Sequence, residues 1–365
     1  MESLVNIVRS PWQDCPVFVT GHTGFKGGWL SLWLRQLGAR VHGYSLNPPT
    51  APAFHDVARV RAAMDSDVRA DLADIARLRS ALHLARPGVV FHLAAQALVR
   101  ESYRDPLGSL ATNVMGTANL LEAARGVDSI RAIVVVTTDK VYLNHEWEHP
   151  YREADHLGGH DPYSASKAAA EIVAASYRAS FFDGPGGHPA RIATARAGNV
   201  IGGGDWAADR LVPDCLRAFA AGQPVSLRFP AAVRPWQHAL EPLAGYLRLA
   251  EHLLLPGGSA FAKAWNFGPD EKSDATVGEV AQAVARLCGN DAHVELESSV
   301  DHPHEAGLLR LDSAAARNAL DWRPRWSLEQ SLVRTVEWHR AWVMGEDMSA
   351  VSLRQIRDYM SEQSV

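Results

Sequence analysis

Cysteine is scarce in this chain. The 365 residues include three cysteines, far apart at Cys15, Cys215 and Cys288. Their odd number and wide spacing exclude a disulfide framework and a structural zinc site, which fits a reducing cytoplasm. No run of about 18 apolar residues is present, so the sequence predicts no membrane span. Residues 1–6 lack the basic and apolar regions of a signal peptide.

An excess of one charge is also lacking. The chain has 36 Lys and Arg residues against 41 Asp and Glu residues, which gives a formal net charge of -5. A mildly acidic chain without basic clusters offers no electrostatic footprint for a nucleic acid. The hydrophobic content of 47% and the charged content of 21% are ordinary for a globular protein. The length allows two modest domains or one enlarged α/β domain.

Short apolar runs of strand length alternate with segments whose apolar residues recur at helical spacing. The expected strands are residues 17–20, 41–45, 89–95, 133–137 and 193–197. The expected helices are residues 29–37, 78–84, 110–125 and 164–181. Runs that are apolar throughout are typical of parallel strands covered on both faces. The alternation therefore predicts an α/β fold with a Rossmann-type, doubly wound parallel sheet.

The pattern becomes less regular in the second half of the chain. Residues 1–198 are expected to form the dinucleotide-binding domain, and residues 199–340 mainly a smaller substrate-binding lobe. Glycine-rich Gly202–Trp206 breaks the regular pattern, and Pro, Trp and Arg become denser after it. Segments within about residues 233–268 are expected to return to the first domain, and residues 341–365 to form a tail.

Three glycines follow the first expected strand at the spacing G-x-x-G-x-x-G. Glycine permits a tight turn, and it lets a pyrophosphate approach the backbone amides at a helix N-terminus. The usual fingerprint is G-x-G-x-x-G, so the spacing alone is also compatible with an ordinary strand–helix turn. The predicted cofactor contacts in this turn are Gly21, Thr23, Gly24, Phe25, Lys26 and Gly27.

The adenosine end of such a cofactor is less clearly marked. Residues 41–47 contain no acidic residue to bind a ribose and no arginine to bind a 2′-phosphate. The choice between NAD and NADP therefore stays open at this position. Asp71 and Leu72 follow the presumed third strand, where a carboxylate could bind the adenine amino group. The alternative is a solvated loop aspartate. Residues Leu93, Ala94 and Ala95 are also expected to contact the cofactor.

Tyr163 and Lys167 are four residues apart on an expected helix, so their side chains share one face. A phenol with a pKa near 10 is a poor base at pH 7. A neighbouring ammonium and a cationic nicotinamide ring both favour the phenolate. In this setting Tyr163 is predicted to remove a hydroxyl proton while hydride leaves the same carbon. A surface pair with no catalytic role is the alternative.

A polar triplet, Thr138-Asp139-Lys140, follows the strand expected at residues 133–137. Ligands of open α/β sheets bind outside the carboxyl ends of the strands. Asp139 could therefore protonate a leaving group. Lys140 could accept a proton, but only in its neutral form. The alternative is a strand-end threonine beside a solvated Asp–Lys pair.

At these residues the chain resembles the extended short-chain dehydrogenase/reductases, and within them the nucleotide-sugar 4,6-dehydratases. The resemblance covers nearly the whole chain. It rests on Gly21–Gly27, His92–Gln96, Asn113–Thr117, Leu120–Glu122 and Arg196–Gly202. Four further segments look like the branch that acts on CDP-D-glucose: Gly202–Trp206, Arg234–His238, His302–Glu305 and Gly345–Met348.

The triplet also resembles that branch. Most of these dehydratases have glutamate at the third position, whereas the CDP-glucose branch has lysine there, as in Lys140. The branch usually reads Thr-Ser-Asp-Lys-Cys-Tyr, whereas this chain has threonine at position 137 and valine at position 141. Neither change touches a group expected to take part in chemistry.

The resemblance implies NAD-dependent dehydration of CDP-D-glucose, in deoxysugar biosynthesis of the kind that supplies lipopolysaccharide O-antigens. The C4 hydroxyl is oxidised, water is lost across C5 and C6, and hydride returns to C6. Thr138 would bind the C4 oxygen, Asp139 would be the acid at the C6 hydroxyl, and Lys140 stands where relatives place the C5 base. The implied substrate contacts are Gln96, Asn199, Arg234, His302 and His304, with Arg234 on the diphosphate and the histidines at the nucleotide end.

Several alternatives stay open. Another nucleotide-sugar 4,6-dehydratase or a 4-epimerase would share the glycine turn and the Tyr/Lys pair, but an epimerase needs no acid and base for loss of water. A catalytically silent NAD-binding regulator would share the fold. No metal is expected, because His302 and His304 have no third ligand at zinc spacing. The resemblance also implies a homodimer built on the helices expected at residues 110–125 and 164–181, and a tetramer is compatible with it.

Overall fold

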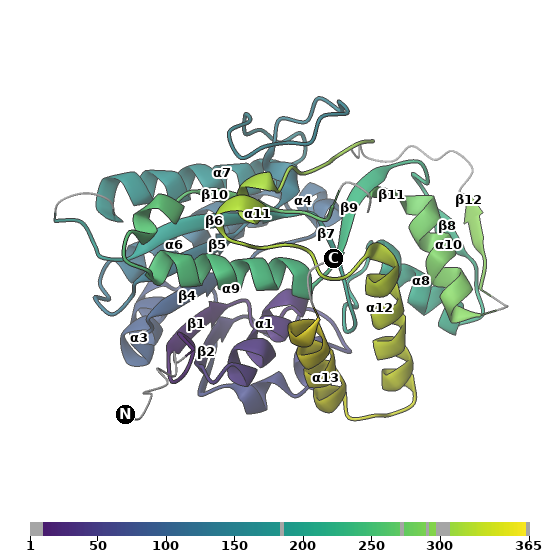
Figure 1. Ribbon diagram of the computed structural model, residues 1–365, viewed down its shortest axis with the longest axis horizontal. Coiled ribbons are helices and arrows are strands. Elements are labelled where there is room, and N and C mark those ends of the chain that lie inside the picture. The colour runs from purple at the N-terminus through teal and green to yellow at the C-terminus, as the bar shows by residue number, and fades with distance from the viewer. Residues whose placement is uncertain (1–9, 183–185, 271–273, 290–291, 297–306, 363–365) are drawn as a thin grey trace, which may run out of the picture.

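The structure is a computed structural model that describes residues 10–182, 186–270, 274–289, 292–296 and 307–362. Its main sheet has seven parallel strands in the order β10-β6-β5-β4-β1-β2-β3 (Figure 1). These strands are β1 (Pro16–Thr20), β2 (Arg40–Ser45), β3 (Ser66–Arg69), β4 (Val89–His92), β5 (Ala132–Val136), β6 (Arg191–Ala197) and β10 (Ala264–Phe267). The strand order 3-2-1-4-5-6 confirms the predicted Rossmann-type sheet.

Successive residues of the strands enter two separate cores. Val17 and Val19 of β1 belong to one core, and Phe18 belongs to the other. The first core contains residues of α1 (Phe25–Gln36), α9 (Leu240–Leu254), α11 (Ala314–Ala319), α12 (Leu328–Val343) and α13 (Met348–Ser361). The second core contains residues of α3 (Ile75–Ala85), α6 (Gly116–Ala124) and α7 (Pro162–Tyr177). Helices on both faces explain why the strand sequences are apolar throughout.

Several element boundaries differ from those expected, and two of these differences have a clear physical cause. The strand expected at residues 89–95 ends at His92, because the next amides turn toward β1 and donate to Thr20. The helix expected at residues 110–125 begins earlier, where the Asp105 side chain caps a turn with Pro106 at its first position. This helix comprises α5 (Pro106–Leu110), a π-helical turn (Ala111–Met115) and α6.

A smaller lobe lies to the right of the main sheet in Figure 1. It has a three-stranded sheet, in the order β11-β9-β7, and a two-stranded sheet of β12 and β8. These strands are β7 (Asn199–Ile201), β8 (Val225–Leu227), β9 (Val233–His238), β11 (Asp274–Thr276) and β12 (Val294–Leu296). Its core includes residues of α8 (Leu211–Ala220) and α10 (Val277–Cys288). The remaining helices are α2 (Phe54–Val57) and α4 (Val99–Arg104), with short turns at Val60–Ala63, Asp139–Val141, Arg178–Phe182 and Gly258–Phe261.

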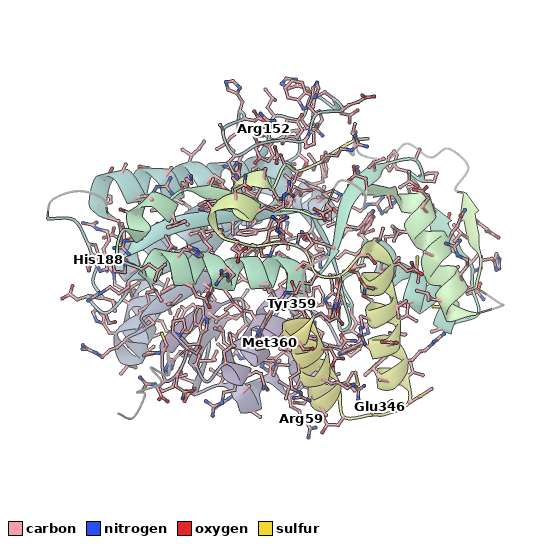
Figure 2. The ribbon with its side chains drawn as sticks, viewed as in Figure 1. Arg59, Arg152, His188, Glu346, Tyr359 and Met360 are labelled. Atoms are coloured by element: carbon pink, nitrogen blue, oxygen red, sulfur yellow. The ribbon has the colours of Figure 1, made fainter. Side chains whose placement is uncertain are left out.

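The end of the chain packs against both parts. Leu332 and Val336 of α12 lie in the core of the lobe, whereas α13 packs on α1 of the main domain. The Arg325 guanidinium donates to the carbonyls of Tyr359 and Met360. Figure 2 shows these two residues at the end of α13. The Tyr359 hydroxyl donates to Glu241 of α9 at 2.6 Å. Among the described residues, no helix is both long and apolar enough to cross a membrane.

Candidate active site

The glycine turn lies where β1 and β4 end, and it leaves no room for side chains at two positions. Gly21 has a φ of +78°, and a Cβ on it would be 2.6 Å from the Ala94 amide nitrogen. A Cβ on Gly27 would be 2.1 Å from the Gly21 carbonyl oxygen. The turn therefore brings its own backbone against the segment Leu93–Ala95 after β4. This is the point where the strand order reverses, the usual place of ligands in such sheets.

The N-terminus of α1 opens onto this point without a competing anion. Gly24 is the N-cap and has no side chain to bind the first amides, and the first turn contains no acidic residue. Free amides and the positive end of the helix dipole suit a pyrophosphate group. The turn therefore fits the dinucleotide that its sequence predicts.

Lys26 adds a cation in the same first turn of α1. Its Nζ donates to the Tyr246 hydroxyl at 3.1 Å. Burial, together with the charges of Lys167 and Arg210, lowers the pKa of Lys26 to about 7, although the charge of Asp139 opposes this shift. Since the charges of Lys167 and Asp139 act on it, the Lys26 amino group lies near the predicted catalytic residues.

The predicted adenosine contacts are only partly brought together. Thr23 is buried, and its hydroxyl lies 2.7 Å from the Ser45 hydroxyl at the end of β2. Leu72 is buried in the second core. Asp71 is exposed, and its carboxylate accepts a hydrogen bond from the Ala73 amide at 2.9 Å. Its role toward an adenine ring stays a prediction.

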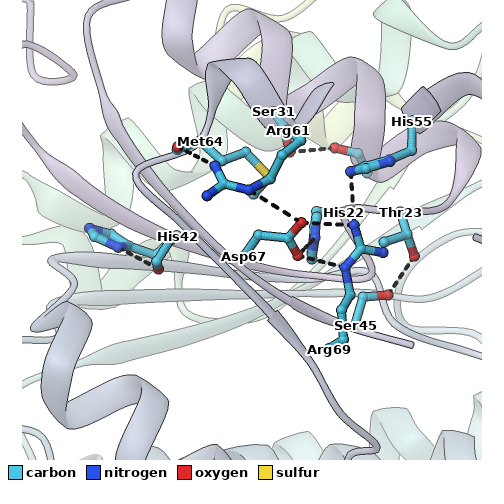
Figure 3. A network of polar contacts seen from close by, with 12 residues as sticks. His22, Thr23, Ser31, His42, Ser45, His55, Arg61, Met64, Asp67 and Arg69 are labelled. Carbon is cyan, nitrogen blue, oxygen red and sulfur yellow. Dashed lines mark hydrogen bonds and ion pairs between the residues drawn. The ribbon is translucent and has the colours of Figure 1, made fainter. Parts of the chain in front are cut away.

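A polar cluster lies beside this end of the site (Figure 3). Asp67 Oδ1 accepts a hydrogen bond from His22 Nε2 at 2.8 Å, and the same oxygen lies 2.7 Å from Arg69 Nε in an ion pair. The His22, His55 and Asp67 ligand atoms lie within 4.8 Å of one another, as in a metal site. However, the Arg69 guanidinium contacts both Asp67 oxygens and lies 3.0 Å from His55 Nε2. A metal ion would have to displace this cation, so we assign no metal here.

Tyr163 and Lys167 lie on α7, and both side chains are buried. Asp161 caps this helix and Pro162 occupies its first position. Lys167 Nζ donates to the Val136 carbonyl at the end of β5, at 3.1 Å. Burial lowers the pKa of Lys167 to about 8, although Glu171 opposes this shift.

Burial raises the pKa of Tyr163 to about 12, and its hydrogen bond with Thr138 lowers it only in part. In the protein alone the phenol therefore keeps its proton at neutral pH. The expected phenolate requires the further positive charge that a cationic nicotinamide ring would bring.

The triplet forms a short turn directly after β5. The Thr138 hydroxyl donates to Asp139 Oδ1 at 2.9 Å, whereas Asp139 Oδ2 is buried without a hydrogen-bond partner. Burial raises the pKa of Asp139, and the charges of Lys140 and Arg234 and the bond from Thr138 oppose this shift. Burial thus favours the protonated form of Asp139 more than water would, and a carboxyl with one unsatisfied oxygen is suited to donate a proton to a ligand.

The predicted substrate contacts have different surroundings. Arg234 on β9 is buried and lies close enough to Asp139 to influence its pKa. Asn199 begins β7 and is half-buried. The Gln96 carboxamide donates to Ser109 Oγ on α5 at 2.8 Å and also bonds to the Leu98 backbone in its own loop. The substrate roles of all three stay predictions. His302 and His304 lie outside the described residues.

Two residues near the centre were missed in the sequence. Arg210 precedes α8, and its charge lowers the pKa of Tyr163. It is bonded to Asp205 at 2.8 Å, within the glycine-rich segment of the lobe. Tyr246 is buried on α9 and bonds Lys26. Neither residue belongs to a sequence motif of the site. Each is far from those motifs in the chain and comes close to them only in the folded structure. The density of glycine, tryptophan and arginine after residue 200 was the only signal for Arg210.

Known proteins are similar to nearly the whole chain. The sequence profile of a family described as GDP-mannose 4,6 dehydratase matches residues 18–335. A CDP-glucose 4,6-dehydratase of Salmonella typhimurium is 49% identical over 358 residues, which cover 97% of this chain and 99% of that protein. A dTDP-glucose 4,6-dehydratase of Xanthomonas campestris is 26% identical, over 90% of this chain and 94% of that protein.

Solved structures agree in fold. MoeE5 in complex with UDP-glucuronic acid and NAD has a TM-score of 0.74 and 26% identity, covering 89% of this chain and 98% of the other. A UDP-glucose-4-epimerase from Stenotrophomonas maltophila, with bound NAD and formylated UDP-arabinopyranose, has a TM-score of 0.78 at 22% identity. The match covers 91% of this chain and 99% of the other. The second likeness concerns the fold alone.

Proposed function

Because the chain belongs to the GDP-mannose 4,6-dehydratase family, we propose that it catalyses the NAD-dependent 4,6-dehydration of CDP-D-glucose. The product is CDP-4-keto-6-deoxy-D-glucose, and the reaction class is that of a hydro-lyase. The observation that carries this function is the 49% identity to a CDP-glucose 4,6-dehydratase over 97% of the chain. The buried Asp139 carboxyl beside Thr138 also favours loss of water over a simple epimerisation.

The cofactor site comprises the glycine turn, the N-terminus of α1 and the segment Leu93–Ala95. We assign the domain that contains this site to residues 1–198 together with α9 and β10. The substrate-binding lobe is assigned mainly to residues 199–340. NAD, when bound there, supplies reversible hydride transfer. Gly21 and Gly27 permit the tight turn that presents the α1 amides to its pyrophosphate, since a side chain at either position would meet backbone atoms of the turn or of the segment after β4.

The first half of the reaction uses the residues at the edge of the main sheet. The Tyr163 phenolate, which the charge of Lys167 stabilises, removes the C4 hydroxyl proton and becomes a neutral phenol. Thr138 binds the C4 oxygen and holds the ketone. Lys167 is itself held by the Val136 carbonyl at 3.1 Å, so its ammonium has a defined position.

Asp139 and Lys140 act in the second half. The 4-keto group acidifies the C5 proton, which Lys140 accepts in its neutral form. Asp139 donates its proton to the C6 hydroxyl, and water leaves across C5 and C6. The raised pKa of Asp139 supports this role, because the acid must carry a proton at neutral pH. The proton held by Lys140 then returns to C5 when C6 is reduced.

Arg234, Asn199, Gln96, His302 and His304 are proposed to bind the nucleotide-sugar. A planar guanidinium suits the oxygens of a diphosphate, and Arg234 is buried at the junction of the lobe and the main sheet. We also propose a cytoplasmic location, because the three free cysteines fit a reducing compartment.

A homodimer is proposed on separate grounds. Large apolar side chains are exposed along the helical layer of α5 to α7, at Leu107, Met115 and Ile172, whose exposed fractions are 78%, 57% and 59%. Exposed apolar side chains that gather on one face mark protein interfaces. A second copy of this chain would cover them, and a tetramer would be compatible.

Comparing four nucleotide sugars tests the proposed function. The purified protein with NAD is incubated with CDP-, dTDP-, UDP- and GDP-sugars, and the keto-sugar is read from its ultraviolet absorbance in alkali. We expect the highest kcat/KM with CDP-D-glucose. An equal or higher kcat/KM with another nucleotide would contradict the proposed substrate, and no ketone from any of them would contradict the dehydratase activity.

A further inference from the structure

Glu171 is a buried carboxylate that the proposed mechanism leaves unused. It lies on α7 four residues after Lys167, and therefore on the same helical face as the catalytic pair. Both of its oxygens are engaged. Oε1 accepts from Thr137 Oγ1 at 2.5 Å and from Arg196 Nε at 3.0 Å, and Oε2 from Thr194 Oγ1 at 2.5 Å and Arg196 Nη2 at 3.1 Å. A buried charge this completely bonded fixes the elements that supply its partners.

The bonding continues from Glu171 to the far side of the catalytic turn. Arg196 on β6 also donates to the Tyr142 hydroxyl at 2.8 Å. That hydroxyl donates in turn to Asn266 Oδ1 on β10, at 2.6 Å. Thr137 directly precedes the triplet, and Tyr142 follows it after one residue. The turn with Thr138, Asp139 and Lys140 is thus held on both sides by one network that starts on the helix of Tyr163.

The charge of Glu171 also acts on Lys167. Burial lowers the pKa of Lys167, and the negative charge of Glu171 raises it. The other titratable groups facing Lys167 are Lys26 on α1 and His92 on β4, besides Tyr163 on its own helix. Burial lowers the pKa of His92 to about 3, so this ring is neutral. Glu171 is therefore the negative charge that favours a protonated Lys167.

We propose that Glu171 is a positioning residue, which couples α7 to the catalytic turn through Thr137 and Arg196 and keeps the Lys167 ammonium charged. The proposal rests on the proposed function for the roles of Tyr163 and Thr138. The coupling through the hydrogen bonds and the effect of the Glu171 charge on Lys167 do not depend on that function.

Two threonines provide a matched test of the coupling. Thr137→Val and Thr194→Val each remove one 2.5 Å hydrogen bond to Glu171, yet only Thr137 adjoins the triplet. Both variants keep the Glu171–Arg196 ion pair, so we expect them to fold with similar losses in Tm. Thr137→Val should lower kcat by about tenfold to 10²-fold, since small misplacements of reacting groups cost this much, whereas Thr194→Val should keep nearly the wild-type kcat. Equal kcat values in the two variants would overturn the coupling.

The electrostatic part is tested on Lys167 itself, without substrate. Lysines are labelled by reductive ¹³C-methylation, and Lys167 is assigned by its loss in Lys167→Arg and titrated by NMR. Glu171→Gln should lower the pKa of Lys167, and the alkaline limb of kcat should move to lower pH with it. Thr137→Val keeps the Glu171 charge and should leave this pKa unchanged. An unchanged pKa in folded Glu171→Gln would refute the charge role. If that variant does not fold, the threonine pair still decides the coupling.

The two readouts separate this inference from the proposed function. If the wild-type protein forms no ketone from CDP-D-glucose, the proposed function fails, whereas the titration of Lys167 still supports or refutes the effect of Glu171. If the wild type is active and the threonine variants behave alike, only the positioning role fails.

Discussion

The two sides of the candidate site are built differently. On the sheet side, Thr138, Tyr163 and Lys167 have exposed fractions of 7%, 9% and 7%, and they rest on a seven-stranded sheet with helices on both faces. On the lobe side, sheets of three and two strands support Arg234 and Asn199. Relatives named for CDP-glucose and dTDP-glucose both extend along at least 90% of the chain. From this difference we expect the sheet side to determine the chemistry and the lobe side to determine the substrate.

The largest effect is expected on the sheet side, from Tyr163→Phe. The variant lacks the hydroxyl that accepts the C4 proton, and general-base contributions run to roughly 10²–10⁴-fold in rate. We expect this loss in kcat with nearly unchanged NAD affinity, measured by turnover and by isothermal titration. Tyr177→Phe, at the end of the same helix, is the control and should keep its activity. Near-normal turnover of Tyr163→Phe would exclude Tyr163 as the base.

Lys140→Met should divide the sheet-side chemistry into its two halves. Oxidation at C4 should continue, whereas exchange of the C5 proton with solvent deuterium should fall by about 10²-fold or more, because the variant lacks the proton acceptor. Mass spectrometry of the recovered sugar measures this exchange. Exposed Lys263→Met is the control. If the C5 proton exchanges at the wild-type rate in Lys140→Met, Lys140 does not remove that proton and another residue must be the base.

Asp139→Asn should instead impair loss of water while C5 exchange continues. The amide keeps the size of the side chain but cannot donate the proton that the C6 hydroxyl needs. We expect kcat for dehydration to fall by about 10²-fold, with deuterium still incorporated at C5 in the recovered substrate. Loss of exchange together with loss of dehydration would show that the two events are coupled, and normal dehydration would exclude Asp139 as the acid.

A smaller effect is expected on the lobe side, from Arg234→Lys. The substitution keeps the charge but removes the planar fork, and a bond to a charged group contributes roughly 1.5–3 kcal/mol. KM for CDP-D-glucose should therefore rise by about tenfold or more, with kcat changed much less, as steady-state kinetics would show. A lower kcat with unchanged KM would place Arg234 on the sheet side of the comparison, consistent with its influence on Asp139.

The smallest kinetic effect is expected at the exposed helical layer, from a side chain of α7 that faces solvent. Ile172→Glu should place a charge in the proposed dimer interface. Light scattering should give twice the chain mass of 39.7 kDa for the wild type and a lower mass for the variant. Exposed Leu84→Glu on α3 is the control, with an exposed fraction of 83%. A wild-type monomer would contradict the proposed dimer.

The sheet side was largely predictable from the sequence. Apolar runs and glycine spacing depend on local rules, so the doubly wound parallel sheet and the glycine turn after its first strand followed from them. The break of the helix after Leu110 was not foreseen, because its residues keep helical periodicity through the π-helical turn. The strand at β4 was predicted, but its early end was not, since apolar residues continue past His92 while the backbone turns toward Thr20.

The long-range contacts were not predictable. Glu171 looks like one polar residue on a helix, and only the folded chain brings Thr137, Thr194 and Arg196 to its oxygens. Arg210 lies 47 residues after Tyr163 in the chain and reaches it from the lobe. Residue spacing carries no information on such contacts. The resemblance to a known family, and not the pattern of residues, indicated the nucleotide.

The most direct test of the account follows the hydride. CDP-D-glucose carrying deuterium at C4 is converted with unlabelled NAD, and the product is analysed by NMR while absorbance follows the reduced cofactor. The account predicts deuterium at C6 of the 4-keto-6-deoxy product, with no reduced cofactor accumulating in step with product. Stoichiometric reduced cofactor together with a product that retains its C6 hydroxyl would contradict it, because the protein would then be a simple dehydrogenase.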